Sequence, residues 1–391
     1  MPSSRSSNRS ELLSRRAALG VLSLGAGAVA FRGRSLLVGC LERDPETDRQ
    51  EVLRQTVRIV MLPTLATLAT QADALLAASV ALRDAPSPDA IAKVRQTWRD
   101  ARATFKQSDA FAIGPSDDLQ ITAGAIDAWP PAIDKLEALV AGTTANDAGP
   151  PDPIDDARAA TLPANQRGFP GIEALLFDAA AGEAEANERL LDNPRRRQLI
   201  ASQATDLAKK CHALEAAWSS SYGNEIAEAG VSSKAFPRQR EAVDELVTAL
   251  LAIAEQVLVA RLAKPLGLDT GGPPQPNLEE AARSDFSLFS IENALLGIDA
   301  IYTCQRDGRR GESFAAATKK SSAAADDAMR KAIDEALAQV RATSTPMRVA
   351  LAGDRAPLVA IHGKIQAVKR AIAGVASALG ASLGFGYSDT D

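Results

Sequence analysis

Apolar residues recur along most of the chain at the three- and four-residue spacing of an amphipathic helix. One stripe of apolar side chains begins at Leu53 and continues to Val80, and Pro63 within it predicts a kink. Helices with the same spacing are expected over residues 91–105, 199–218, 243–257, 314–341 and 355–380. No stretch keeps the two-residue alternation of a half-buried strand. The pattern therefore predicts an all-α fold.

Caps and breaks separate these helices. Ser87-Pro88 and Asn193-Pro194 each place a capping side chain before a proline that suits the first helical turn. Breaks rich in polar residues, Gly or Pro lie at residues 141–153, 220–230 and 264–277.

Two tandem helical bundles are expected, over residues 40–222 and 235–391, because 391 residues exceed one ordinary core. An internal repeat supports this division, since FPGIEALLFD (169–178) aligns with LFSIENALLG (288–297) at an offset of 119. Both segments follow a Pro-rich loop. The identical pairs are Ile172/Ile291, Glu173/Glu292 and Leu176/Leu295. We interpret the repeat as an internal duplication of one bundle.

Composition favours helices and excludes one class of partner. The chain is 46% hydrophobic but only 4% aromatic, with many Ala and Leu residues, a bias that favours helix over strand. Residues 1–39 carry six Arg and one Glu, which leaves 38 basic and 48 acidic residues in the remainder. A remainder with a formal net charge of −10 lacks the basic surface that nucleic-acid binding needs. No nucleic-acid partner is expected.

Residues 1–39 have the features of an export signal. The segment SRRAAL (14–19) is similar to a twin-arginine signal. The Gly- and Ala-rich stretch 17–31 has the length of the apolar region of a signal and is too short to span a membrane as a helix. We therefore expect the mature protein to work outside the cytoplasm of a bacterium.

The segment LVGC (37–40) is similar to a lipobox, in which Cys40 would carry lipid after cleavage. Arg32 and Arg34 separate this segment from the apolar region, which is unusual for a lipobox. Cleavage after Ala30 is the alternative, and it would release a soluble protein. The lipobox interpretation predicts a periplasmic or outer-membrane-associated lipoprotein, anchored to the membrane through Cys40.

Few residues suit metal or redox chemistry. Apart from the lipobox cysteine, Cys211 and Cys304 remain, either as a disulfide or as isolated thiols. His212 and His362 are the only histidines, whereas a catalytic zinc site usually takes two or three imidazoles. His212 and Glu215 have a ligand-like spacing that is also common on helix surfaces. The sequence contains no phosphate-binding loop, nucleophile elbow or dinucleotide fingerprint.

Carboxylates are the remaining candidates for a site. Glu173 stands in the apolar run RGFPGIEALLF, where it could be a ligand, a helix-capping acceptor or a solvated helix residue. Asp117 and Asp118 follow a long helix, and Asp389 and Asp391 end the chain. Together these oxygens could hold a hard cation. The alternative is that the aspartates are helix caps or part of a solvated tail.

Five segments, in order along the chain, carry the pattern of a known family. They are TWRDARATFKQSDAFAIGPSDD (97–118), IDAWP (126–130), RGFPGIEALLF (167–177), SLFSIENALLGI (287–298) and LGFGYSDTD (383–391). Together they resemble the imelysin-like exported lipoproteins, and the resemblance covers most of residues 48–391. It implies two four-helix bundles with a cleft between them that the first-half motif lines. The candidate residues for this cleft are Glu173, Asp117, Asp118, Gly168, Glu292, Arg102 and Trp129.

The resemblance has one departure in its central motif. Imelysins were named as metallopeptidases and carry a G-x-H-x-x-E motif. Gly168 and Glu173 fit that motif, but Pro170 occupies the position of the histidine. This departure argues against peptidase activity and against the metal site of the family. Other relatives are linked with iron acquisition.

The favoured function is therefore a non-catalytic exported binding lipoprotein, with other proteins of an uptake system as partners. Its candidate ligands are iron, another divalent cation, a metal complex or a peptide, and Glu173 and Asp117 are weak candidates as metal ligands. The alternatives are a divergent metallopeptidase and a structural scaffold. If Glu173 is buried without a metal, its expected partner is one of Arg95, Arg99 and Arg102.

Overall fold

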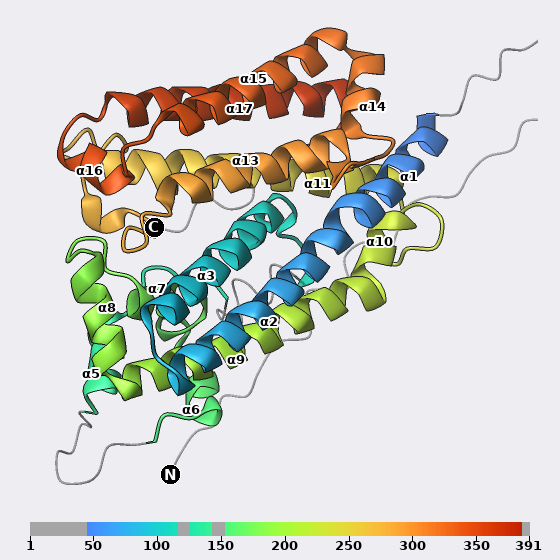
Figure 1. The fold of residues 1–391 in the computed structure, drawn as a ribbon. Helices are drawn as coiled ribbons and strands as arrows, with labels where there is room; N and C mark the ends of the chain where they lie inside the picture. The colour runs from blue at the N-terminus through green and yellow to red at the C-terminus, as the bar shows by residue number, and fades with distance from the viewer. Residues whose placement is uncertain (1–44, 116–125, 143–152, 385–391) are drawn as a thin grey trace, which may run out of the picture. The chain divides into compact units, whose positions relative to one another are not determined.

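Two sets of long helices meet where α3 packs against α13 (Figure 1). The structure is a computed structural model and describes residues 45–115, 126–142 and 153–384. All of these residues lie in one compact unit that begins at Arg43. Helices dominate the described residues, which confirms the predicted all-α class.

The first set lies N-terminal to residue 228, and its centre is α2, which packs against both α3 and α9. The short helix α7 packs on α9. Its described elements are α1 (Pro45–Gln55), the π-helix η1 (Thr56–Met61), α2 (Leu62–Asp84), α3 (Pro88–Ser108), the 3-10 helix η2 (Asp109–Phe111), α5 (Ile133–Ala141), α6 (Asp156–Thr161), the 3-10 helix η4 (Ala164–Gln166), α7 (Gly168–Leu176), α8 (Glu183–Asp192), α9 (Pro194–Ala217), the π-helix η5 (Trp218–Tyr222) and α10 (Gly223–Ala227).

The second set contains the C-terminal helices, with α17 packed against α15 and α11, and α13 packed against α15 (Figure 1). Its described elements are α11 (Gln239–Gln256), the π-helix η6 (Val257–Ala263), α12 (Lys264–Leu266), the 3-10 helix η7 (Pro276–Leu278), α13 (Ser287–Thr303), β1 (Gln305–Arg306), β2 (Arg309–Arg310), α14 (Phe314–Ser321), α15 (Ala323–Ala342), α16 (Met347–Ala352) and α17 (Ala356–Leu379).

Helices α3 and α13 run in parallel and approach closely. Trp98, in the middle of α3, meets Phe286, the residue before α13, at a ring-centroid distance of 5.6 Å. Further along, Gln107 donates to Asn293 over 2.9 Å. A Cβ atom on Gly297 would lie only 2.2 Å from the backbone oxygen of Gln107. The two sets can therefore pack this tightly only because residue 297 has no side chain.

Both predicted helix caps are present. The Ser87 hydroxyl accepts a hydrogen bond from the Ala90 amide over 3.1 Å, at the start of α3. The Asn193 side chain accepts one from the Arg196 amide over 2.9 Å, at the start of α9. Each bond satisfies an amide that has no partner within its own helix.

Prolines inside long helices follow π-helical segments. The π-helix η1 comes directly before α2, whose second residue is Pro63, at the position of the predicted kink. The π-helix η6 likewise comes directly before α12, whose second residue is Pro265. A proline cannot donate to the carbonyl four residues earlier, and its ring crowds that carbonyl. Widening the preceding turn lets the helix continue without that bond.

Two segments differ from the sequence prediction. Residues 220–230, expected as a loop, are largely helical because η5 continues directly into α10. Residues 305–310, for which no strand was predicted, form a two-stranded antiparallel hairpin. Asp307 and Gly308 turn this hairpin with left-handed φ values of 50° and 78°. Asp-Gly is a favoured sequence for such a turn, but the strands are too short to show an alternating pattern.

Two segments, Arg49–Asp84 and Gln239–Leu266, are long and apolar enough to cross a membrane by length and composition. Within the described chain, α2 packs against α3 and α9, and α11 packs against α17, so we assign both segments to the core. The internal duplication and the division at residues 222 and 235 stay predictions.

Candidate functional site

Glu173 lies on α7, a helix whose nine residues are all buried. The helix begins at Gly168, which has a left-handed φ of 70°, a conformation that glycine adopts without strain. The Phe169 amide then donates to the carbonyl of Ile126 over 2.8 Å, which anchors the first turn. A Cβ on Gly171 would lie 2.9 Å from the backbone of Gln166, so α7 packs tightly against the residue at the end of η4. This geometry directs Glu173 into the interior.

The carboxylate of Glu173 binds one residue of the second set. Its Oε1 accepts hydrogen bonds from the Ser284 amide over 3.0 Å and from the Ser284 hydroxyl over 2.7 Å. Glu173 is only 3% exposed, and burial raises its pKa against the opposing effects of the Arg102 charge and the two Ser284 bonds. Glu173 therefore ties α7 to the loop before α13.

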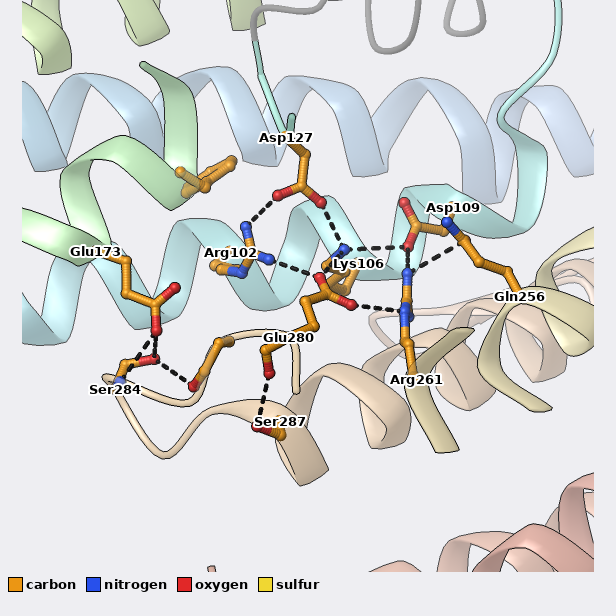
Figure 2. Close-up of polar contacts among 12 residues, drawn as sticks. Arg102, Lys106, Asp109, Asp127, Glu173, Gln256, Arg261, Glu280, Ser284 and Ser287 are labelled. Carbon is orange, nitrogen blue, oxygen red and sulfur yellow. Dashed lines mark hydrogen bonds and ion pairs between the residues drawn. The ribbon is translucent and has the colours of Figure 1, made fainter. Parts of the chain in front are cut away.

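Beside Glu173, six charged side chains form a buried network (Figure 2). Arg102 Nη1 lies 2.5 Å from Asp127 Oδ1, and Arg102 Nη2 lies 2.7 Å from Glu280 Oε1. Lys106 Nζ contacts the same two acids, at 2.6 Å from Asp127 Oδ2 and 2.7 Å from Glu280 Oε1. Three cations thus face four carboxylates when Glu173 is counted. The six members of the network are Arg102, Lys106, Asp109, Asp127, Arg261 and Glu280.

Arg261 brings a third cation from η6 of the second set. Its Nη2 lies 2.7 Å from Asp109 Oδ2, and its Nε lies 2.8 Å from Glu280 Oε2. Arg261 is 4% exposed and Arg102 is fully buried, so water screens these charges very little. Since Arg102 and Lys106 belong to α3, the network connects the two helix sets.

The cations fix the ionisation of Glu280. Burial alone would raise the pKa of Glu280, but the charges of Arg261, Lys106 and Arg102 outweigh burial and hold this pKa far below its ordinary value. Burial alone would likewise lower the pKa of Arg102, but Asp127 and Glu280 raise it. Glu280 and Arg102 are therefore charged at neutral pH, and removing either one would leave a buried charge without a partner.

The sequence candidates have different environments. Arg102 and Glu173 lie close enough for the charge of one to shift the pKa of the other. Glu292 accepts a hydrogen bond over 2.7 Å from Arg341 of α15, and this ion pair is partly exposed. Trp129 is half-buried and precedes Pro130 through a cis peptide bond. The candidates that lie outside the described residues are Asp117, Asp118, Asp389, Asp391 and Cys40.

The expected partner of a buried Glu173 was an arginine, and the structure shows a different arrangement. Among the described residues, Ser284 supplies the direct hydrogen bonds, whereas Arg102 binds Asp127 and Glu280. The sequence reasoning missed Lys106 in this network. One signal was available, since Lys106 stands four residues after Arg102 and falls with it on the apolar side of α3.

The described residues do not fit a resident metal ion at Glu173. Pro170 has no side-chain donor atom, and the positive charge of Arg102 would repel a cation. Residues 45–115, 126–142 and 153–384 contain no group of three or more His, Cys, Asp or Glu side chains that could hold a metal. His212 instead contacts Asp73 at the surface, with 2.9 Å between Nε2 and Oδ2.

The two core cysteines are separate thiols in the structure. Cys211 and Cys304 are both free and buried. Burial raises the pKa of Cys211 to about 12, so this thiol is a poor ligand and nucleophile at neutral pH.

Comparison with known proteins supports the resemblance seen in the sequence. The sequence profile of the imelysin family (peptidase M75) matches residues 61–375. Iron-regulated protein A of Synechococcus elongatus is 29% identical over 252 residues. That match covers 63% of this chain and 62% of the relative, so the chain spans less than two thirds of it.

Two solved bacterial structures share the fold. A protein of Parabacteroides distasonis, described as an iron-regulated protein A precursor, superimposes with a TM-score of 0.74 at 21% identity. That superposition covers 87% of this chain and 97% of the other. An imelysin-like protein of Psychrobacter arcticum superimposes with a TM-score of 0.67 at 17% identity, covering 89% of this chain and 100% of the other.

Proposed function

Because the chain belongs to the imelysin family, we propose that it is an exported, iron-related binding protein without peptidase activity. The link to iron is supported by relatives that are described as iron-regulated protein A. Export is supported by the signal-like residues 14–31 and the lipobox-like residues 37–40. The expected partners are the membrane, through lipid on Cys40, and other proteins of an uptake system.

The environment of Glu173 carries the non-catalytic part of this proposal. A metallopeptidase needs a metal-bound water and a free base beside it. Pro170 cannot bind a metal, and Ser284 already donates two hydrogen bonds to Glu173 Oε1. The charge of Arg102 further disfavours a cation at this position. The alternative of a divergent metallopeptidase would have to take its ligands from outside the described residues.

The proposal is tested on the full chain purified from its native compartment. We expect elemental analysis to find iron with the protein, in equal amounts in the wild type and in Glu173→Gln. We expect neither form to hydrolyse a mixed peptide library. Hydrolysis that disappears in Glu173→Gln would establish the metallopeptidase alternative. A wild-type protein without iron would contradict the iron-related function.

Stability measurements separate binding from folding in this test. Glutamine can still accept both Ser284 bonds through its side-chain oxygen, and it removes a buried charge. Glu173→Gln should therefore change the free energy of unfolding by less than about 1 kcal/mol. Glu173→Ala leaves the Ser284 amide and hydroxyl without their acceptor and should cost about 2–4 kcal/mol. Urea unfolding of both variants measures the difference.

A further inference from the structure

Two arginines of α3 lie over one aromatic ring at the edge of the contact between the helix sets. The Cζ atoms of Arg95 and Arg99 are 5.5 Å and 5.0 Å from the centre of the Phe177 ring. Arg283, from the loop before α13, donates to the backbone oxygen of Phe177 over 3.0 Å. Three guanidinium groups therefore surround Phe177, which caps the C-terminal end of α7.

Among the described residues, neither Arg95 nor Arg99 has a buried carboxylate partner, whereas every cation of the buried network has one. Arg95 donates to neutral groups, the Leu176 oxygen over 3.0 Å and the Asn187 side chain over 2.7 Å. The nearest carboxylate to Arg95 is Glu183, at 3.7 Å and with a side chain that is 83% exposed. Arg99 is half-buried and forms no hydrogen bond or ion pair with any described residue.

This arrangement costs folding energy that a bound anion would recover. Burial lowers the pKa values of both arginines, and the charge of Glu183 only partly opposes it. The charge of Arg99 also lowers the pKa of Arg95, so the two guanidinium groups repel each other. A carboxylate placed between them would relieve the repulsion and restore the missing hydrogen bonds.

The other described carboxylates that act on these arginines or lie near Phe177 have hydrogen-bond partners elsewhere, as Asp100 has in Gln96 at 2.7 Å. Asp178 receives hydrogen bonds from both Arg283 and Arg189. Asp285, which acts on Arg99 electrostatically, binds Arg348 at 2.7 Å. The described part of the chain therefore leaves the donor groups of Arg99 for a bound molecule.

A row of aromatic rings leads from Phe177 to the surface, and it begins where Trp98 packs on Phe177 with 5.0 Å between ring centres. Trp98, the neighbour of Arg99 in sequence, packs against Phe286, and Phe289 stacks on Phe286 with 5.5 Å between ring centres. Phe289 is 55% exposed, so this row of rings reaches solvent. A ligand that joins a carboxylate to an apolar or ring-bearing body would match both features.

We propose that Arg95 and Arg99 bind a carboxylate of the ligand, and that this ligand is an anionic chelate of ferric iron rather than a bare metal ion. The chelate assignment rests on the proposed iron-related function, whereas the anion site rests on the arginines alone. Arg99, whose guanidinium lies over the Phe177 ring, has N–H groups that no described residue accepts from, and these can make a bidentate contact with a carboxylate. The same two positive charges repel a free cation.

Calorimetric titration of the full chain tests this proposal, with ferric citrate, iron-free citrate, inorganic phosphate and ferrous ion as probes. We expect ferric citrate to bind the wild type more tightly than the other three probes. Arg99→Gln should weaken that binding at least about tenfold, because it removes the positive charge and the guanidinium donors. Arg99→Lys should recover only part of the loss, because lysine lacks the planar fork. Glu183→Gln should strengthen binding, because it removes a competing carboxylate.

The control variant is Arg58→Gln, which removes an exposed arginine on η1 and should bind ferric citrate like the wild type. Arg99 makes no hydrogen bond with the described residues and repels Arg95, so Arg99→Gln should melt at or above the temperature of the wild type, which excludes unfolding as the cause of lost binding. Unchanged ferric citrate binding in Arg99→Gln overturns the site. Equal binding of citrate with and without iron overturns the chelate assignment, and preferred binding of phosphate or ferrous ion overturns the ligand class. Native protein that carries iron while Arg99→Gln has no effect refutes this site and leaves the proposed function standing.

Discussion

Lys106 Nζ lies 2.7 Å from Glu280 Oε1, and this contact joins the end of α3 to the loop that leads into α13. The Lys106 side chain is 2% exposed and that of Glu280 is 13% exposed. Glu280 also accepts from Arg102 and faces Arg261, so this one carboxylate contacts all three buried cations of the network, which come from both helix sets. Glu280 is therefore the residue on which the contact between the sets most depends.

Glu280→Gln should lower the free energy of unfolding by about 3–5 kcal/mol, because three buried cations lose a shared counter-charge. Urea unfolding at pH 7 measures this loss. The matched control is Glu292→Gln, since Glu292 pairs with an Arg341 side chain that is 55% exposed. That substitution should cost less than about 1 kcal/mol. Equal losses in the two variants would show that the network does not hold the sets together.

A second carboxyl group in the same loop gives the protein a dependence on pH. Burial raises the pKa of Glu279 to about 7 from its ordinary 4.5, against the opposing hydrogen bond from Ser287. Between these values the folded protein keeps a proton that the unfolded chain has lost. The free energy of unfolding should therefore fall by up to about 3 kcal/mol as the pH rises from 4.5 to 7.

Glu279→Gln should remove this dependence, because glutamine does not titrate. Urea unfolding at pH 5 and pH 8 should show a smaller difference between the two pH values in the variant than in the wild type. Glu292→Gln again serves as control and should keep the wild-type difference. A Glu279→Gln protein that loses as much stability between pH 5 and pH 8 as the wild type would assign the effect to other groups.

Gly297→Ala should destabilise the protein by about 2 kcal/mol or more, because the new methyl group would meet the Gln107 backbone of α3 at 2.2 Å. Gly374→Ala, in the middle of α17, is the matched control, since no atom lies within 4 Å of its Cβ position. That change should stabilise the protein by about 0.5–1 kcal/mol through better helix propensity. Thermal melts measure the stability of both variants. If Gly297→Ala is stabilised as Gly374→Ala is, the close packing of α3 and α13 is contradicted.

Cys40→Ala should move the protein from the membrane fraction to the soluble periplasmic fraction. Residues 37–40 are similar to a lipobox, so the acyl chains that anchor the protein would be attached to Cys40. Stable anchoring takes more than one acyl chain, and the substitution removes the residue that would carry them. Fractionation followed by immunoblotting measures the change. Cys211→Ala, which removes a buried core thiol, should stay with the membrane. A wild-type protein already found in the soluble fraction would favour cleavage after Ala30 instead.

The sequence predicted local features of the fold well because short-range physics determines them. Ser87 and Asn193 cap their helices as expected, since each acts on an amide three residues away. Pro63 marked the right place for a departure from α-helix, although the form it takes, a π-helical segment, was not foreseen. The Asp307-Gly308 turn carried a recognisable hairpin signal that the strong helical pattern elsewhere obscured.

The site was harder to predict because its contacts join distant parts of the chain. The apolar neighbours of Glu173 indicated burial correctly, but its partner Ser284 lies 111 residues later. Arg261 meets Asp109 across 152 residues, and no local pattern distinguishes either from a surface residue. The sequence suggests Arg99 only as a partner for Glu173, whereas in the structure it lies over the Phe177 ring and has no hydrogen-bond partner among the described residues.

The shared position of Glu280 between three cations also limits how the molecule can move. Many two-part binding proteins admit their ligand by hinge opening, which requires an interface that separates at low cost. Separating the two helix sets would strip Arg102 and Lys106 of Glu280, and Arg261 of Asp109, in a region with little water. The two helix sets should therefore move as one rigid body on the timescale of ligand exchange. Any ligand must then enter and leave at the edge of the contact, without a clamshell motion.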